Sequence, residues 1–356
     1  MGVRYIGSKA RVADLIADLA GDPTPGGRFV DAFSGTGAVA AAAASRGWAV
    51  TLNDQLPSAV AMSVGAVVGA GNVAFESLGG YRAAVAALNA APGRPGFLHA
   101  EYSPASAGIG IVERRYFTSE NAARLDAMRA LIRTWSHDGR LTHAEEQLLL
   151  ADLMQAANSV ANISGTYGCF LKKWTSGALR HVEVAPRHLP DRTTAFTATT
   201  DDVFDVRTTD MDTVYLDPPY TKRQYSAYYH VLETLHAGDS PQVVGVTGLR
   251  PWQDRASVFC YKVKALDALT QLILGLRARR ILLSYSTEGH VPKDHLINAL
   301  SEAGRVTVHE LSTIGRYRPN ARASAAGDTV DEYVIEIEPV RLHEGPVHEP
   351  CAAVLV

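Results

Sequence analysis

Apolar and polar residues alternate along this chain with two different periods. Short runs of strand type occur at residues 29–30, 48–52, 196–199, 214–216, 281–286, 306–311 and 333–337. Apolar residues at the spacing of one helical face occur near residues 12–19, 119–132, 143–161, 257–276 and 293–303, and residues 38–45 are rich in alanine. Strands repeat every two residues and helices every 3.6, so these patterns predict a mixed α/β protein.

The first strand, helix and second strand form a familiar unit. The first strand runs into residues 31–37, Asp-Ala-Phe-Ser-Gly-Thr-Gly, and the second ends at Asn53 and Asp54. Gly35 and Gly37 let the chain turn and let a ligand approach the backbone, and folds of this kind place an acid roughly 20 residues later for ribose hydroxyls. The turn lacks the lysine of a phosphate loop and the third glycine of the dinucleotide motif, and two glycines can also serve packing alone. We expect a doubly wound, Rossmann-like sheet that binds a nucleoside ligand.

A second motif, Asp217-Pro218-Pro219-Tyr220, ends the apolar run at 214–216. An acid at the end of a buried strand has no partner in the core and should face a ligand at the carboxyl edge of the sheet. The prolines lack backbone donors and end the strand abruptly, which leaves carbonyl oxygens free to accept hydrogen bonds. With the flat ring of the tyrosine, these groups could hold a planar group that carries an amine. A plain Pro-Pro turn is the alternative.

The composition narrows the class of protein. The chain of 356 residues is 47% hydrophobic and 20% charged, with a net charge of −3, three widely spaced cysteines and 12 histidines in no ligand-spaced cluster. No apolar run approaches the roughly 20 residues needed to span a bilayer, and no signal-peptide pattern opens the sequence. We therefore expect a cytoplasmic globular enzyme without a disulfide framework, a metal or a membrane contact. Nucleic acid would have to be bound by local basic patches.

Residues 57–195 separate the two motifs and are too long for an ordinary connection. Prolines and glycines predict an irregular stretch over about 90–112, and helices follow. Thr142 and Glu145 form a capping-box pattern at the start of the helix over about 143–161.

Basic and aromatic residues gather in several predicted loops. Glycines, hydroxyls, paired lysines and a tryptophan in one loop suit contacts to a nucleic-acid backbone, although they also suit a solvated surface. The candidates for DNA contacts are Lys172, Lys173, Trp174, Lys222, Arg223, Arg316 and Arg318. Arg114 and Arg115 could extend the patch. Tyr225, Tyr228 and Tyr229 lie at helical spacing, which indicates packing or contacts to a base or cofactor.

Together, residues 31–37 and 217–220 resemble the motifs of an S-adenosylmethionine-dependent amino-methyltransferase. The order of parts is similar to the Dam-type, or alpha, group of DNA adenine methyltransferases, in which a motif for the methionine end of the donor precedes the glycine motif. Residues 4–9, Arg-Tyr-Ile-Gly-Ser-Lys, resemble that N-terminal motif. The likeness covers about residues 1–56 and 196–338.

The resemblance implies a division of the chain. Residues 1–56 and 196–338 would form the catalytic domain that binds S-adenosylmethionine. Residues 57–195 would form an inserted, mainly helical domain that recognises the DNA target, and residues 339–356 would be a C-terminal tail.

The resemblance also implies roles for single residues. Those assigned to the cofactor are Tyr5, Gly7, Ser8, Lys9, Asp31, Phe33, Ser34, Gly35, Thr36, Gly37, Asp54 and Asp202. Asp202 is the acid expected to face the cofactor adenine, with Asp201 as the alternative. In catalysis, Asp217 and the Pro218 carbonyl would accept the hydrogens of the 6-amino group of a flipped-out adenine. Pro219 shapes the turn, and Tyr220 would stack on the base.

Several alternatives stay open. A cytosine 4-amino target is disfavoured because Asp rather than Ser opens the second motif, and enzymes that methylate RNA adenine or protein glutamine more often carry Asn there. A catalytically silent nucleic-acid-binding module of the same fold is a further alternative, against which the presence of Gly35, Gly37, Asp54 and Asp217 argues. The sequence does not decide the recognition site, the oligomeric state or whether a restriction or defence system is a partner.

Overall fold

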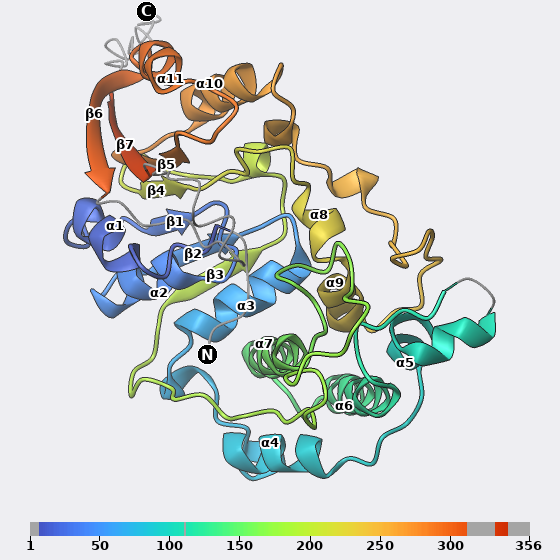
Figure 1. The fold of residues 1–356 in the computed structure, drawn as a ribbon. Coiled ribbons are helices and arrows are strands. Elements are labelled where there is room, and N and C mark those ends of the chain that lie inside the picture. The colour runs from blue at the N-terminus through green and yellow to red at the C-terminus, as the bar shows by residue number, and fades with distance from the viewer. Residues whose placement is uncertain (1–6, 110–111, 312–331, 341–356) are drawn as a thin grey trace, which may run out of the picture.

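A seven-stranded sheet forms the centre of the computed structural model, which describes residues 7–109, 112–311 and 332–340 (Figure 1). The strands are β1 (Phe29–Asp31), β2 (Val50–Asn53), β3 (Phe196–Thr199), β4 (Thr213–Leu216), β5 (Arg280–Ser286), β6 (Gly304–Leu311) and β7 (Glu332–Pro339). Their order is β3-β2-β1-β4-β5-β7-β6. The first five are parallel, whereas β7 runs antiparallel to both β5 and β6. From β1 the chain first adds strands on one side, β2 and β3, and then on the other, β4 and β5. The topological switch point therefore lies between β1 and β4, and ligands bind at such a point in open α/β sheets.

Alternate residues of the strands fill two apolar layers. Phe29 and Tyr215 point into one layer, and their neighbours Val30 and Val214 point into the other. The first layer is covered by α1 (Ala13–Ala20), α2 (Ala38–Ser45) and α3 (Pro57–Val67), the second by α10 (Ala265–Gly275) and α11 (Lys293–Leu300). Figure 1 shows the two groups of helices on opposite sides of the sheet. The predicted doubly wound, Rossmann-like fold is confirmed.

A layer of helices lies beyond α3, as Figure 1 also shows. It consists of α4 (Tyr81–Ala90), α5 (Phe97–Tyr102), α6 (Ser119–His137), α7 (His143–Ser159) and α9 (His230–Ala237), which is preceded by the short α8 (Tyr225–Tyr228). Helix α3 contacts β2 and β3 on one side and α7 and α9 on the other. One apolar cluster therefore runs from the sheet through α3 into this layer. Within residues 57–109 and 112–195 the structure contains no strand, in keeping with a mainly helical segment.

Local predictions had mixed outcomes. The capping box is present, because Thr142 Oγ1 accepts from the Glu145 backbone N–H and Glu145 accepts from that of Thr142. The stretch expected to be irregular contains α5 and a 3-10 helix at Pro104–Ile109. The helix expected over 257–276 was wrong at its start: a 3-10 turn at Val258–Cys260 precedes α10. The backbone N–H of Ser257 bonds to the Gln224 side chain, and the turn packs Phe259 and Cys260 inward.

Neither a membrane-spanning helix nor a cluster of metal ligands is found in the described ranges. None of the helices in these ranges is long and apolar enough to cross a membrane. In the same ranges, no three histidine, cysteine or acidic side chains gather closely enough to hold a metal ion.

Candidate active site

The two sequence motifs meet at the switch point of the sheet. Strands β1 and β4 are parallel neighbours, so the glycine turn after β1 and the Asp217–Tyr220 segment after β4 leave the sheet at the same edge. A cavity of about 360 Å³ lies between them and is lined by residues of both motifs. The expectation that they meet at the carboxyl edge is confirmed.

The glycine turn contributes in two ways. Gly35 lines the cavity, and its N–H donates to Asp54 Oδ2 at 3.0 Å. Gly37 has a φ of 76°, and a Cβ there would lie 2.5 Å from the Cα of Ser63 in α3. Gly35 therefore faces the cavity, whereas Gly37 is needed for close packing of the turn on α3. Ser34 and Thr36 also line the cavity.

Asp31, the acid that opens the glycine motif, is deeply buried, with 2% of its surface exposed. Its Oδ1 atom receives no hydrogen bond from any described residue. Burial, together with the charges of Asp217 and Asp54, raises the pKa of Asp31 well above its usual range. A buried carboxylate oxygen without a donor is costly, so the site suits a ligand that brings a positive charge or a donor.

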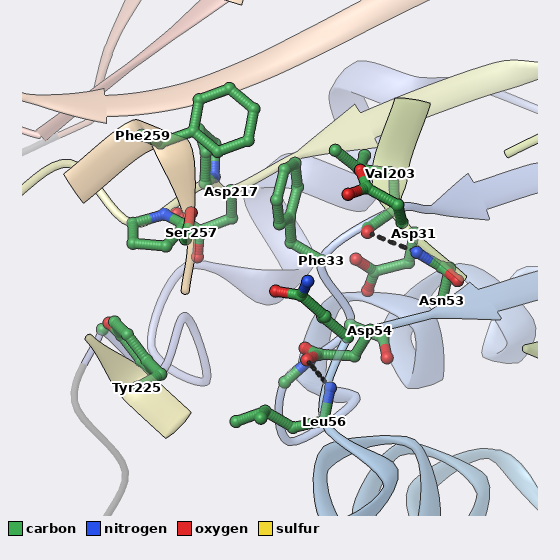
Figure 2. A pocket seen from close by; sticks show the side chains of 18 of the residues that line it. Asp31, Phe33, Asn53, Asp54, Leu56, Val203, Asp217, Tyr225, Ser257 and Phe259 are labelled. Carbon is green, nitrogen blue, oxygen red and sulfur yellow. Dashed lines mark hydrogen bonds between the residues drawn. The ribbon is translucent and has the colours of Figure 1, made fainter. Parts of the chain in front are cut away.

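Asp54 lies across the cavity from Ser257, as Figure 2 shows. Its two oxygens accept backbone N–H groups of Gly35 and Leu56, both at 3.0 Å. Burial raises the pKa of Asp54 to about 6, although those two hydrogen bonds oppose the rise. Asp54 is therefore held in a fixed orientation at the rim of the cavity.

Asn53 is a structural residue that the sequence analysis did not single out. Its amide nitrogen donates to the carbonyls of Ala32 and Asp201, each at 3.2 Å, and its oxygen accepts from the Asp201 N–H. It thereby ties the ends of β1 and β2 to the segment after β3. A polar residue at the end of a buried strand was the signal that could have found it.

Asp202 and its alternative Asp201 both line the cavity. Asp202 Oδ1 accepts from the Phe204 N–H at 3.1 Å and caps the short turn Val203–Asp205. Phe204 stacks on Phe259 with centroids 6.0 Å apart, and Phe259 meets the edge of Phe33 at 5.6 Å. The three rings form an apolar wall of the kind that accommodates a heterocycle.

At the other end of the cavity, Lys9 meets Asp217. Lys9 Nζ donates to both carboxylate oxygens of Asp217, at 2.8 and 2.9 Å, and to the Gly7 carbonyl at 3.3 Å. Burial alone would lower the pKa of Lys9, but the charge of Asp217 raises it, so the lysine stays cationic. Burial raises the pKa of Asp217, and Lys9 opposes that rise. The two side chains therefore form a buried ion pair that fixes the position of the Asp217 carboxylate.

The remaining residues of both motifs have defined places. Pro218, Pro219 and Tyr220 line the cavity. Lys9 Nζ lies 5.7 Å from the ring centroid of Tyr220, a cation–π distance. Gly7 and Ser8 line the same end of the cavity, whereas Tyr5 lies outside the described residues.

The chain was compared with known protein families. Residues 5–297 match the family described as D12 class N6 adenine-specific DNA methyltransferase. The chain belongs to that family.

Similar curated proteins are methyltransferases of type II systems or modification methylases. The chain is 33% identical over 249 residues to the type II methyltransferase M.FokI of Planomicrobium okeanokoites, over 68% of this chain and 37% of that protein. It is 30% identical over 310 residues to the modification methylase StsI of Streptococcus sanguinis, over 84% of this chain and 46% of StsI. It is 30% identical over 294 residues to the type II methyltransferase M.NlaIII of Neisseria lactamica, over 81% of this chain and 84% of that protein. The chain thus spans less than half the length of M.FokI and StsI and most of M.NlaIII.

The candidate DNA contacts of this D12 family member lie mostly on the surface. Lys172, Lys173, Lys222 and Arg223 are exposed, and Trp174 is half-buried. The loop that carries the lysines is folded around Asn162, whose side chain bonds to the Leu171 carbonyl and the Thr175 N–H. Arg316 and Arg318 lie outside the described residues.

Two other predicted surface residues behave differently. Arg114 is 1% exposed, pairs with Glu101, and donates to the carbonyls of Gly245 and Val246. A surface role for Arg114 was therefore wrong, because its guanidinium is used to hold the 245–248 turn. Arg115 stays partly exposed and donates to the Lys172 carbonyl.

The tyrosines after the second motif divide between the two roles considered. Tyr225 lines the cavity, where its hydroxyl lies 3.0 Å from the position of a Cβ on Gly7. Tyr229 is 1% exposed and belongs to the apolar core. The ring of Tyr228 packs near Gly168.

A further wall of the D12 site was not foreseen. Residues 255–259 line the cavity opposite Asp54, and Figure 2 shows Ser257 and Phe259 across from Asp31 and Asn53, with Phe33 between. Residues 257–259 of this segment were predicted to be the start of a helix. Its aromatic Phe259 next to small polar residues was a weak signal for a site.

Proposed function

We propose that this D12 family member is a site-specific DNA-methyltransferase (adenine-specific). It transfers a methyl group from S-adenosylmethionine to the exocyclic 6-amino group of a flipped-out adenine in duplex DNA. The observation that carries the proposal is the opening of the glycine turn and the Asp217–Tyr220 segment into one cavity of about 360 Å³. The order of the N-terminal segment, glycine motif, insertion and Asp-Pro-Pro-Tyr favours the Dam-type arrangement within the family.

The residues present fit S-adenosylmethionine. The unpartnered Oδ1 of buried Asp31 suits the ammonium group at the amino acid end of the donor. We assign Asp54 to the ribose hydroxyls, and Asp202 with the wall of Phe33, Phe204 and Phe259 to the adenine ring, because all of them line the cavity. Other residues proposed for the donor are Gly7, Ser8, Ser34, Gly35 and Thr36. When bound, S-adenosylmethionine supplies an activated methyl group on a sulfonium.

The amine is handled by the second motif. Nitrogen N6 of adenine is a poor nucleophile, because its lone pair is delocalised into the ring. Asp217 and the Pro218 carbonyl accept its two hydrogens, which favours a pyramidal nitrogen with its lone pair aimed at the methyl group. Lys9 favours the ionised form of Asp217. Because Lys9 Nζ bonds to both carboxylate oxygens, the amine has to share one of these oxygens with the lysine. The proton released after transfer can rest on Asp217, whose pKa is raised by burial.

The rate enhancement in this mechanism comes mainly from alignment. Holding two reactants in line can supply up to about 7–11 kcal/mol in favourable cases. Base flipping costs a few kcal/mol, which stacking on Tyr220 and backbone contacts must recover. We assign those contacts to Lys172, Lys173, Trp174, Lys222 and Arg223, and the target-recognition role to residues 57–195. A cognate restriction or defence system is the proposed partner, because similar proteins are modification methylases.

The test is transfer of labelled methyl from S-adenosylmethionine to unmethylated duplex DNA, followed by nucleoside analysis and sequencing of the product. We expect N6-methyladenine with the wild-type protein and none with Asp217→Ala. Asp267→Ala, which changes an exposed acid on α10, is the matched control and should retain transfer. Methylcytosine, labelled RNA, labelled protein or binding without transfer would each contradict the proposal.

A further inference from the structure

A short segment crosses the cavity and touches both of its ends. We call residues 252–260 the strap. Its backbone at Ser257 is bound twice by one side chain: the Ser257 N–H donates to Gln224 Oε1 at 2.8 Å, and Gln224 Nε2 donates to the Ser257 carbonyl at 3.1 Å. Gln224 itself lies four residues after Tyr220 and lines the cavity. These two hydrogen bonds attach the strap to residues 220–224, which follow the Asp217–Pro219 turn.

Further contacts, made by Cys260 and His290, also join the strap to residues 220–224. Cys260 Sγ lies 3.3 Å from the Arg223 carbonyl, within hydrogen-bond distance for sulfur. His290 lies between the two segments, with Nε2 3.1 Å from the Cys260 carbonyl and its backbone N–H donating to the Tyr220 carbonyl at 2.9 Å. The strap and residues 220–224 are therefore joined at several points and should move together.

The strap also reaches the side of the cavity that we assign to the cofactor. Phe259 packs against Phe33 and Phe204, 5.6 and 6.0 Å between centroids. Arg255 pairs with Glu233 at 2.9 Å.

Glu233 extends this connection to α3. Its side chain is 94% buried, and it also accepts the Ser58 N–H at 3.0 Å. Ser58 lies in the first turn of α3, directly after the Asp54–Leu56 turn. One hydrogen-bonded segment thus connects the cofactor wall with residues 220–224.

We propose that Gln224 is a positioning residue that couples the cofactor site to the target-base site through the strap. This inference rests on the proposed function. A ligand that orders Phe259 and Arg255 also orders residues 220–224, and a base that is held by Tyr220 orders the strap in return. By thermodynamic reciprocity, each ligand then tightens the binding of the other by the same factor. Gln224 contributes no atom to the reaction itself.

The experiment compares the dissociation constant of S-adenosylhomocysteine with and without a duplex that carries the sequence methylated by the wild-type protein. This product analogue has no methyl to transfer, so the DNA stays unmodified during the calorimetric titration. We expect DNA to tighten its binding by at least about fivefold in the wild-type protein, the lower end of typical coupling between sites. In Gln224→Met, which keeps the length of the side chain and removes both hydrogen bonds, the ratio should fall close to one. Without DNA, binding should change by less than about threefold.

The matched control is Gln253→Met, the same change at an exposed glutamine within the strap. Among the described residues, its side chain bonds only to the neighbouring Trp252 N–H. It should keep the wild-type ratio. A wild-type ratio of one, or a wild-type ratio retained by Gln224→Met, overturns the inference. If circular dichroism shows that Gln224→Met does not fold, Gln224→Glu takes its place. The glutamate keeps the acceptor for the Ser257 N–H and loses the donor, so it should lower the ratio, and an unchanged ratio overturns the inference equally.

Failure of the proposed function is recognised separately. It appears as DNA that carries no labelled methyl after incubation with the wild-type protein. Loss or retention of coupling in a protein that methylates DNA concerns Gln224 and the strap alone.

Discussion

Lys9 Nζ lies 2.8 and 2.9 Å from the two carboxylate oxygens of Asp217, and the side chains are 5% and 17% exposed. The lysine comes from the start of the chain and the aspartate from the end of β4, 208 residues later. A buried ion pair holds its members firmly, because either charge alone would be strongly destabilised. Lys9 therefore keeps Asp217 ionised, and it also occupies the oxygens that a substrate amine must reach.

Lys9→Met should move the acid limb of the pH dependence of kcat/KM to higher pH. Burial raises the pKa of Asp217 and Lys9 lowers it, so removal of the lysine raises that pKa further. The reaction needs the carboxylate form, and activity on the acid side should fall by roughly tenfold for each pH unit of the shift. Lys264→Met, at an exposed lysine, is the control. An acid limb that stays in place would refute the role of Lys9.

Cofactor affinity should depend on pH through Asp54. Burial raises the pKa of this carboxyl to about 6 in the free protein. If ribose hydroxyls bind the ionised form, protonation below pH 6 competes with the ligand. The dissociation constant of S-adenosylhomocysteine should then rise by up to about tenfold between pH 6 and pH 5, and it should change little above pH 7. Asp54→Asn should remove this dependence; an equal slope in the variant would count against the assignment.

Phe204→Ala should weaken cofactor binding with little loss of stability. Phe204 is 46% exposed and stacks on Phe259 in the apolar wall. Stacking of a base on an aromatic ring contributes about 1–3 kcal/mol, so the dissociation constant should rise roughly five- to 150-fold. Tyr261→Ala is the matched control, because Tyr261 is also 46% exposed, lies directly after the strap and is not among the residues that line the cavity. Equal effects of both changes in a titration would disprove the assignment.

Gly37→Ala should cost more stability than Gly26→Ala. Both glycines have a φ of 76°, but a Cβ at Gly37 would lie 2.5 Å from the Cα of Ser63, whereas nothing lies within 4 Å at Gly26. Gly26→Ala should lower the free energy of unfolding by about 1–2 kcal/mol through backbone strain alone. The clash should add about 1–3 kcal/mol for Gly37→Ala. Urea unfolding measures both, and similar losses would show that α3 can move away.

Replacing Lys172 and Lys173 by alanine should weaken DNA binding through phosphate contacts. Each lost contact reduces the slope of log K against log salt by about 0.9. The double variant should therefore lose about two units of slope and weaken binding to all sequences alike. Arg277→Ala, at an exposed arginine that pairs with Asp210, is expected to leave the slope unchanged. Fluorescence anisotropy at several salt concentrations distinguishes these outcomes.

The chemistry of the two strand ends could be predicted from the amino-acid sequence. Residues 31–37 and 217–220 act through properties of single residue types. Glycine adopts positive φ, proline lacks an N–H, and an acid after a buried strand finds no polar partner in the apolar core. Such properties are local, so they can be read from a few contiguous residues. The apolar run at residues 281–286 and the alternation at 333–337 likewise predicted strands, which the structure contains as β5 and β7.

Which distant groups meet depends on the three-dimensional packing. Lys9 was predicted to contact the cofactor and is found on Asp217, Arg114 was expected on the surface and is buried, and residues 257–260 of the strap were expected to be helical. These outcomes depend on side-chain bonds to the backbone of remote segments, such as Gln224 to Ser257. Bonds of that kind join residues far apart in the chain and leave no periodic pattern, because any polar side chain brought near an unpaired backbone group can make them.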